Sequence, residues 1–142
     1  MHHRWAALAL VLALCAVPTK QAAGQRLDTL SRGRKPSGQL GQNWPNPFTT
    51  ETNIPFTVTD CGGGRPHTVS LRVYNVLAQL VAIPVLDSTG AAVSKLKLAC
   101  GSYVARWNGK VNNTRRAATS GVYIYELMID GNPQAKKMFV GK

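Results

Sequence analysis

The sequence has few acidic side chains and few of the residues that usually carry out catalysis. Six Asp and Glu stand against 17 Lys and Arg, which gives a formal net charge of +11. Of three histidines, His2 and His3 lie at the N-terminus and His67 stands alone beside a turn. The carboxylates are isolated along the chain, so no close pair suits acid–base chemistry. No Ser–His–Asp or Cys–His motif occurs either, and we therefore expect the protein not to be an enzyme.

The sequence also lacks the residue spacing of a metal or nucleotide site. Its cysteines are Cys15, Cys61 and Cys100, and they do not combine with a lone histidine into a zinc site. The glycines at 62–64 precede neither a Lys-Ser/Thr pair nor a helical pattern, so they predict a turn rather than a phosphate-binding loop. We expect no metal, no cofactor and no small-molecule substrate.

The basic charge is scattered along the chain. The adjacent basic pairs are Arg34-Lys35, Arg115-Arg116 and Lys136-Lys137, and no basic run is interleaved with aromatic residues as in a nucleic-acid reader. We therefore expect no nucleic-acid partner. A basic surface suits contact with anionic lipopolysaccharide, phospholipid or a surface polymer, and the simpler interpretation is a solvated surface.

The N-terminus has the layout of a secretory signal peptide. A short basic start is followed by an unbroken apolar run of 13 residues from Trp5 to Val17 and by the small residues Ala22-Ala23-Gly24. The run is too short for a comfortable membrane span, and the alternatives are an uncleaved anchor or a buried helix. We expect an exported protein with a signal peptide at 1–24, a basic flexible linker at 25–38 and one folded domain at 39–142.

Alternating apolar and polar residues predict strands, not helices, from Gln39 onwards. The expected strands are 52–58, 68–74, 80–87 cut short by Pro84, a small strand at 95–98, 102–107, 122–129, and 135–140 after the hairpin signal Asp130-Gly131-Asn132. Their number and spacing predict an all-β, immunoglobulin-like antiparallel β-sandwich of about seven strands. A small barrel is the alternative.

Removal of a signal peptide would leave two cysteines, Cys61 and Cys100. Cys61 ends the first expected strand and Cys100 precedes the strand that starts at Ser102, so strand reversals place both at one end of a sandwich. In an exported chain this predicts a disulfide, with two free thiols as the alternative. The bridge would close a loop of about 39 residues and stabilise the fold by about 4 kcal/mol in the chain-entropy model.

Five segments occur in one order: LGQNWPNPF with TNIPFTV, VSLRVYNVLAQLV, GSYVARWNGK, ATSGVYIYEL and KKMFV. Together they resemble the C-terminal sorting domain of type IX secretion substrates and the closely similar immunoglobulin-like domain of the flagellar hook-cap protein, over Gln39 to Lys142. The resemblance implies a sorting signal read by outer-membrane secretion machinery, for delivery through the periplasm to the cell surface or medium. The implied recognition residues are Gly121, Tyr123, Lys137, Met138, Phe139 and Val140.

The chain departs from the family pattern in three ways. Asn75-Val76-Leu77-Ala78-Gln79 carries alanine where the family has glycine; if that position needs a positive φ, Ala78 strains it by about 1 kcal/mol. The loop 87–100 is longer than usual, and no cargo domain lies between the expected leader and the domain. Two rival interpretations are a stand-alone structural or adhesive module at the cell surface and a small hydrolase with a hidden site at His67.

The opening segment GQNWPNPF predicts an ordered lead-in to the first strand rather than a linker. Prolines fix φ and push the residues before them into extended conformation, and Asn43 and Asn46 can each bond their own backbone two residues on. We expect the two aromatic residues of this segment to cap the core, with Trp107 as a further anchor. The expected structural residues are Trp44, Pro45, Asn46, Pro47, Phe48 and Trp107.

Overall fold

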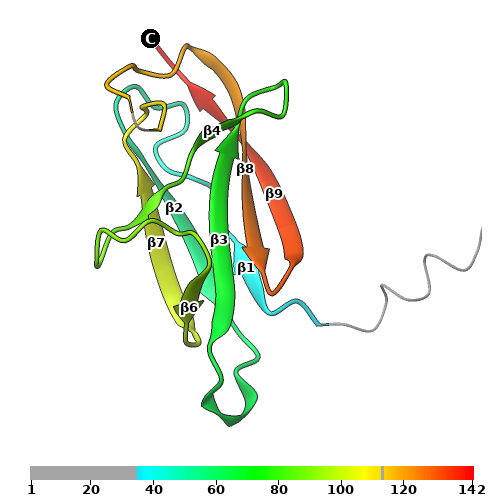
Figure 1. Ribbon diagram of the computed structural model, residues 1–142. Coiled ribbons are helices and arrows are strands. Elements are labelled where there is room, and N and C mark those ends of the chain that lie inside the picture. The colour runs from blue at the N-terminus through cyan, green and yellow to red at the C-terminus, as the bar shows by residue number, and fades with distance from the viewer. Residues whose placement is uncertain (1–34, 113) are drawn as a thin grey trace, which may run out of the picture. The chain divides into compact units, whose positions relative to one another are not determined.

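The computed structural model describes residues 35–112 and 114–142, which belong to one compact unit from Lys35 to Lys142 (Figure 1). The expected signal peptide and residues 25–34 of the expected linker lie outside the described residues. The described residues form nine β-strands and one short 3₁₀ helix, η1, at Gly62–Gly64. The strands are β1 (Gly38–Leu40), β2 (Thr52–Val58), β3 (His67–Tyr74), β4 (Leu80–Ala82), β5 (Val85–Leu86), β6 (Leu96–Leu98), β7 (Gly101–Trp107), β8 (Gly121–Ile129) and β9 (Asn132–Val140).

The strands form two antiparallel sheets that pack face to face. Sheet A has the order β1-β2-β7-β5, and sheet B has the order β4-β3-β8-β9 with β6 also paired to β3. In the lettering of immunoglobulin domains these orders correspond to A-B-E-D and C′-C-F-G. The predicted β-sandwich is confirmed, and two separate sheets rule out the small barrel.

The predicted number of strands, about seven, is too low. The segment 80–87, expected as one strand, forms two: β4 pairs with β3 in sheet B, whereas β5 pairs with β7 in sheet A. Pro84 lies between them and has no N–H for a ladder, so the chain crosses between the sheets there. The end of the expected linker also belongs to the fold, because Ser37 accepts a hydrogen bond from the Thr59 N–H at 2.8 Å and Gly38 begins β1.

The period-two pattern correctly predicts which residues face the core. Val69, Leu71 and Val73 of β3 are fully buried, as are alternate residues of β2, β7 and β8. Every buried apolar residue of the described core lies between Leu40 and Val140. The unit from Lys35 to Lys142 therefore contains its complete core and meets the requirement for a domain that folds on its own.

Two tyrosines, one near the start of β7 and one near the start of β8, hydrogen-bond the backbone of the segment that precedes each strand. The hydroxyl of Tyr103 donates to the Ala99 carbonyl at 2.7 Å, and the hydroxyl of Tyr123 donates to the Thr119 carbonyl at 2.9 Å. A tyrosine that bonds the backbone a few residues upstream is a typical corner of immunoglobulin-like domains. Tyr123 therefore has a structural role in this fold.

Three successive segments cover the free edge of β3. β4 pairs with its last residues, the Leu71 N–H donates to the Val93 carbonyl at 2.9 Å, and β6 pairs with its first residues. An uncovered strand edge is a template for pairing with another chain. The long segment between β3 and β7 therefore protects this side of sheet B.

The turn between β3 and β4 holds an alanine in the left-handed region. Ala78 has a φ of 58°. Its N–H donates to the Asn75 carbonyl at 3.0 Å, and the Asn75 N–H donates to the Gln79 carbonyl at 3.1 Å. The requirement for a positive φ at this position is confirmed, and a Cβ there costs about 1 kcal/mol.

We predict that Ala78→Gly stabilises the domain by about 0.5 kcal/mol, which raises Tm by about 2 °C for a domain of this size. Glycine relieves a left-handed strain of about 1 kcal/mol, and the greater conformational entropy of the unfolded glycine variant offsets part of that gain. Thermal unfolding followed by circular dichroism measures the shift. The matched control is Ala92→Gly, at an exposed alanine outside the positive-φ region, which should stabilise nothing. A Tm for Ala78→Gly at or below that of the parent protein would contradict the prediction.

Candidate recognition surface

The hairpin of β8 and β9 brings the six expected recognition residues together, but it divides them between two environments. Tyr123 pairs with Met138 and Gly121 pairs with Val140 along the hairpin. Tyr123, Met138 and Val140 are buried in the core, whereas Lys137 and Phe139 are exposed. Only the last two side chains, on the outer face of sheet B, are accessible to a partner. Gly121 has a φ of 147°, a conformation that favours glycine.

A cluster of three aromatic rings closes the end of the core beside the C-terminus. Phe48 and Trp107 meet edge to face with 5.4 Å between ring centroids, and Trp107 meets Tyr123 in the same way at 5.6 Å. The expectation that Phe48 and Trp107 anchor the core is confirmed. The expectation for Trp44 is wrong, since its side chain is 73% exposed. The lead-in turns its backbone, not the Trp44 ring, towards the core: Trp44 exchanges two backbone hydrogen bonds with Asn53.

The lead-in, residues 41–48, runs along the outer edge of β9. Asn46 accepts a hydrogen bond from the Phe139 N–H at 2.9 Å, so it does not bond its own backbone as expected. The Phe48 N–H donates to the Phe139 carbonyl at 3.1 Å, and the Gln42 side chain donates to the Lys137 carbonyl at 3.1 Å. The predicted ordered lead-in is confirmed. Its bonds occupy the end of the β9 edge, where another chain could otherwise add a strand.

Two buried polar side chains fasten the lead-in to the sandwich. The Tyr125 hydroxyl donates to the Gly41 carbonyl at 2.9 Å and accepts from the Asn43 N–H at 3.0 Å. Burial raises the pKa of the Tyr125 phenol, so this donor stays protonated. The Asn43 amide donates to the Pro45 carbonyl at 3.2 Å, two residues on as expected, and to the Thr52 hydroxyl at 2.9 Å.

Gln134 of β9 joins sheet B to β1 of sheet A. Its amide oxygen accepts from the Leu40 N–H at 3.0 Å, and its amide nitrogen donates to the Gly38 carbonyl at 2.8 Å. One side chain therefore satisfies the outer edge of β1 as a neighbouring strand would. No motif in the sequence predicted this role for Gln134. The sequence does carry one indication: Gln134 lies an even number of residues before Met138 and Val140, so this polar side chain faces the same side of β9 as those core residues.

The outer face of sheet B carries a strip of exposed or half-buried apolar side chains. Phe139 is directly opposite Val122, and the next row across the sheet is Lys137, Ile124, Tyr74 and Leu80. Phe139 is 47% exposed and Leu80 is 50% exposed. Cross-strand neighbours on one face are in contact, so these residues form a continuous strip with one lysine beside it. Contiguous exposed apolar surface is characteristic of docking sites.

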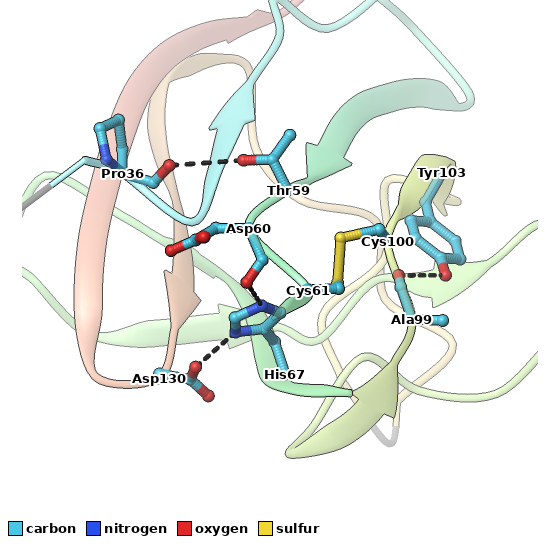
Figure 2. Close-up of a disulfide and its surroundings, with 9 residues drawn as sticks. All are labelled: Pro36, Thr59, Asp60, Cys61, His67, Ala99, Cys100, Tyr103 and Asp130. Atoms are coloured by element: carbon cyan, nitrogen blue, oxygen red, sulfur yellow. Dashed lines mark hydrogen bonds and ion pairs between the residues drawn. A yellow bond between two sulfur atoms is a disulfide. The ribbon is translucent and has the colours of Figure 1, made fainter. Parts of the chain in front are cut away.

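The other end of the sandwich holds the disulfide (Figure 2). Cys61 and Cys100 are bonded, with 5.7 Å between their Cα atoms, and they join the end of β2 to the start of β7. The predicted disulfide is confirmed and the free-thiol alternative is not. Beside it, the His67 ring contacts the Asp130 carboxylate through Nδ1 at 2.5 Å and the Asp60 carbonyl through Nε2 at 3.2 Å.

His67 favours its protonated form because both of its ring nitrogens face acceptors. A neutral imidazole donates from one nitrogen only, whereas the imidazolium donates from both. The hydrogen bond to Asp130 is the main cause that raises the pKa of His67 above its ordinary value, and desolvation opposes it. The same bond, followed by the bond from the Thr68 N–H, lowers the pKa of Asp130. The pair links the β2–β3 connection to the β8–β9 turn and contains no nucleophile.

The remaining features of the described residues are the lack of a metal-binding cluster and a shallow depression on sheet A. No group of three or more His, Cys, Asp or Glu side chains among them could hold a metal ion. A shallow depression on sheet A is lined by Pro55, Phe56, Tyr103 and Val104, with no carboxylate or histidine in its wall. Within the same residues, no helix is long and apolar enough to cross a membrane.

Comparisons of the chain with protein-family models, with curated proteins and with solved structures find no match. The fold therefore rests on strand order, register and the two tyrosine corners. The functional interpretation rests on the resemblance carried by the sequence and on the surfaces that the sandwich exposes.

We predict that the domain loses stability as the pH rises through the raised pKa of His67. Below its ordinary pKa of about 6.5 the ring is charged in both folded and unfolded chains, and the full stabilisation is present. Above that value the unfolded chain releases the proton first, so stability falls until the folded ring also deprotonates. Urea unfolding from slightly acid to slightly basic pH measures this loss. His67→Asn should flatten the profile, and NMR titration of Asp130→Asn should show the His67 pKa returning towards its ordinary value. An unchanged profile in His67→Asn would refute the assignment.

We predict that Cys61→Ser with Cys100→Ser destabilises the domain by about 4 kcal/mol, because the unfolded chain regains the entropy of a loop with a sequence separation of 39. Urea unfolding of the double variant and of the parent protein measures the difference. The parent protein under reducing conditions is the matched control and should lose a similar amount. If the reduced and oxidised proteins unfold at the same urea concentration, the expected contribution is wrong.

Proposed function

We propose that this protein is an exported, non-enzymatic chain whose β-sandwich is a sorting signal, recognised by outer-membrane machinery of the type IX kind. Delivery would lead through the periplasm to the cell surface or the medium. The resemblance of five segments in one order supports this proposal.

One observation carries the proposal: the two ends of the resemblance form one structural unit. The opening segment lies on the closing strand through Asn46, Phe48 and Gln42, which bond the backbone of Lys137 and Phe139. A partner that recognises β9 therefore recognises a strand that is held in place only when the whole domain is folded. Such a signal is read only from the folded domain, because the lead-in and β9 are far apart in the sequence.

The recognition residues in this proposal are Lys137 and Phe139. Their side chains face solvent beside Val122 and Ile124, whereas Tyr123, Met138 and Val140 are committed to the core. The docking mode is contact with the face of sheet B. Strand addition is disfavoured, because the lead-in occupies the end of the β9 edge and Pro133 lacks an N–H at the start.

A second candidate is a stand-alone structural or adhesive module that remains at the cell surface. The covered edges of β1, β3 and β9 favour it, because a permanently exposed β-sandwich has to avoid pairing with its neighbours. The two candidates differ in the fate of the domain. A sorting signal is consumed or released, and a module is retained.

We predict that mass spectrometry of fractions from the native organism will find, outside the outer membrane, a short peptide that begins near Gln25 and ends near Arg34, without the domain that starts near Lys35. Lys137→Ala with Phe139→Ala should reduce the exported amount about tenfold, which corresponds to the loss of about 1.4 kcal/mol of docking energy. The matched control is Lys95→Ala with Val104→Ala, which removes an exposed cation and an exposed aliphatic side chain away from this face.

Circular dichroism of each purified variant checks that the sandwich is intact. Retention of residues up to Lys142 in a surface-bound form would reject the sorting proposal in favour of the module. Equal export of the two double variants would reject Lys137 and Phe139 as the recognition residues.

A further inference from the structure

The turn between β3 and β4 exposes aliphatic side chains that no part of the fold requires. Val76 is 70% exposed, Leu77 is 75% exposed and Leu80, at the start of β4, is 50% exposed. Single exposed apolar residues are ordinary in soluble proteins, but three within five residues form a local apolar tip. The tip projects at the end of the sandwich where the chain terminates (Figure 1).

The tip is rigid, because the side chain of Asn75 braces the turn from inside. Its oxygen accepts from the N–H groups of Leu77 and Gln79, each at 3.0 Å, and its nitrogen donates to the Gln79 side chain at 2.8 Å. The two backbone bonds of the turn add to this network. These bonds fix the conformation of the turn while Val76 and Leu77 remain exposed to water. A turn that is already ordered loses less conformational entropy when its apolar side chains bind an apolar surface.

Basic side chains lie on the loop and the C-terminal segment at the same end of the domain as the tip (Figure 1). The β7–β8 loop lies beside β4, because Asn112 donates its N–H to the Val81 carbonyl at 2.8 Å and accepts from the Ile83 N–H at 3.0 Å. The loop reaches the C-terminal residues through the Ser120 hydroxyl, which donates to the Gly141 carbonyl at 3.1 Å. The exposed cations of these segments are Lys110, Arg115, Arg116 and Lys142.

Residues 75–80, 141–142 and the described part of 108–120 contain no Asp or Glu. Glu126 is the carboxylate nearest in sequence to these segments, and Glu51, which precedes β2, lines a depression together with Asn108 and Asn112. We name the three segments together the basic apolar end. Its chemistry is an aliphatic tip with four exposed cations on neighbouring segments.

We propose that the basic apolar end docks on an anionic phospholipid bilayer, with Val76, Leu77 and Leu80 entering the interface and the four cations meeting lipid phosphates. Aliphatic side chains gain by leaving water, and cations gain near anionic headgroups, so one contact satisfies both. A second copy of the chain is a poor occupant, because the same cations would meet each other. Nucleic acid or an anionic polymer would match the charge but leave the aliphatic tip in water. This binding is independent of the sorting proposal.

The test uses residues 35–142, which contain the complete core, and co-sedimentation with vesicles. One set of vesicles contains phosphatidylcholine with about one third phosphatidylglycerol, and the other contains phosphatidylcholine alone. We expect binding to the anionic vesicles and much weaker binding to the neutral ones. Val76→Asn with Leu77→Gln should lower the partition coefficient about tenfold, since two aliphatic side chains no longer leave water. Arg115→Gln with Arg116→Gln should lower it by at least about tenfold.

Matched controls separate this end from the rest of the surface. Val104→Gln removes an exposed aliphatic side chain from sheet A, and Arg65→Gln with Lys95→Gln removes the same charge as the arginine pair but from elsewhere. Both should bind the anionic vesicles like the parent protein. Circular dichroism of every variant checks the fold, which these exposed positions should leave unchanged.

Three outcomes would overturn the proposal. The first is no binding to anionic vesicles, and the second is an equal loss from both charge pairs with no effect of the turn variant, which would indicate general charge attraction. The third is intact vesicle binding by the turn variant together with reduced export in the native organism, which would assign the turn to a protein of the secretion machinery. Lost vesicle binding with normal export would support the bilayer contact and leave the sorting proposal untouched.

Discussion

The attachment of the lead-in to β9 is the interaction on which the rest of the domain depends. Without the bonds from Asn46 and Phe48 to Phe139, the last strand would have an open edge. The aromatic cluster would also lose Phe48, the ring that meets Trp107 over the end of the core. The buried Tyr125 hydroxyl would then have no backbone to bond at Gly41 and Asn43. The same eight residues, 41–48, therefore protect the edge of β9, close the end of the core and provide hydrogen-bond partners for the buried Tyr125 hydroxyl.

The sandwich protects its edges mainly with single side chains and short segments. Gln134 completes β1, Asn46 and Gln42 bond β9, and short strands cover β3. Amide side chains suit this task because each offers a donor and an acceptor with the geometry of a peptide group. Partners are consequently directed to the faces and the ends of the sandwich. The outer face of sheet B and the turn after β3 are where apolar side chains remain in water.

Local pattern predicted most of the fold. Alternation in β2, β3 and β8 identified the core positions, and the Asp130-Gly131 hairpin and the disulfide followed from turn chemistry and strand direction. The apolar pattern of 80–87 could not show that this segment is divided between two sheets, because both of its halves are apolar. Only the neighbouring strands, β3 for the first half and β7 for the second, determine the division.

The functional surface was less accessible from the sequence. The motif residues of the last two strands include core and surface positions, and only the register separates Lys137 and Phe139 from Met138 and Val140. The rings of Trp44 and Phe48 were both expected to cap the core from a lead-in ordered by its prolines, yet Trp44 is bonded to Asn53 through its backbone and its side chain is exposed. The role of Gln134 depends on a strand that lies 94 residues away, and no local rule reaches that far.

The disulfide has a consequence for transport that does not depend on stability. Once Cys61 and Cys100 are joined, the chain contains a covalent ring and cannot be drawn out as a single thread. Pulled from either end, the ring stays a doubled strand until it is reduced. A channel wide enough for one extended chain must therefore carry this protein before the bond forms. A channel that accepts the oxidised protein must admit two strands abreast or the whole sandwich. The width of a channel therefore decides whether this chain could pass through it before or only after the Cys61–Cys100 bond has formed.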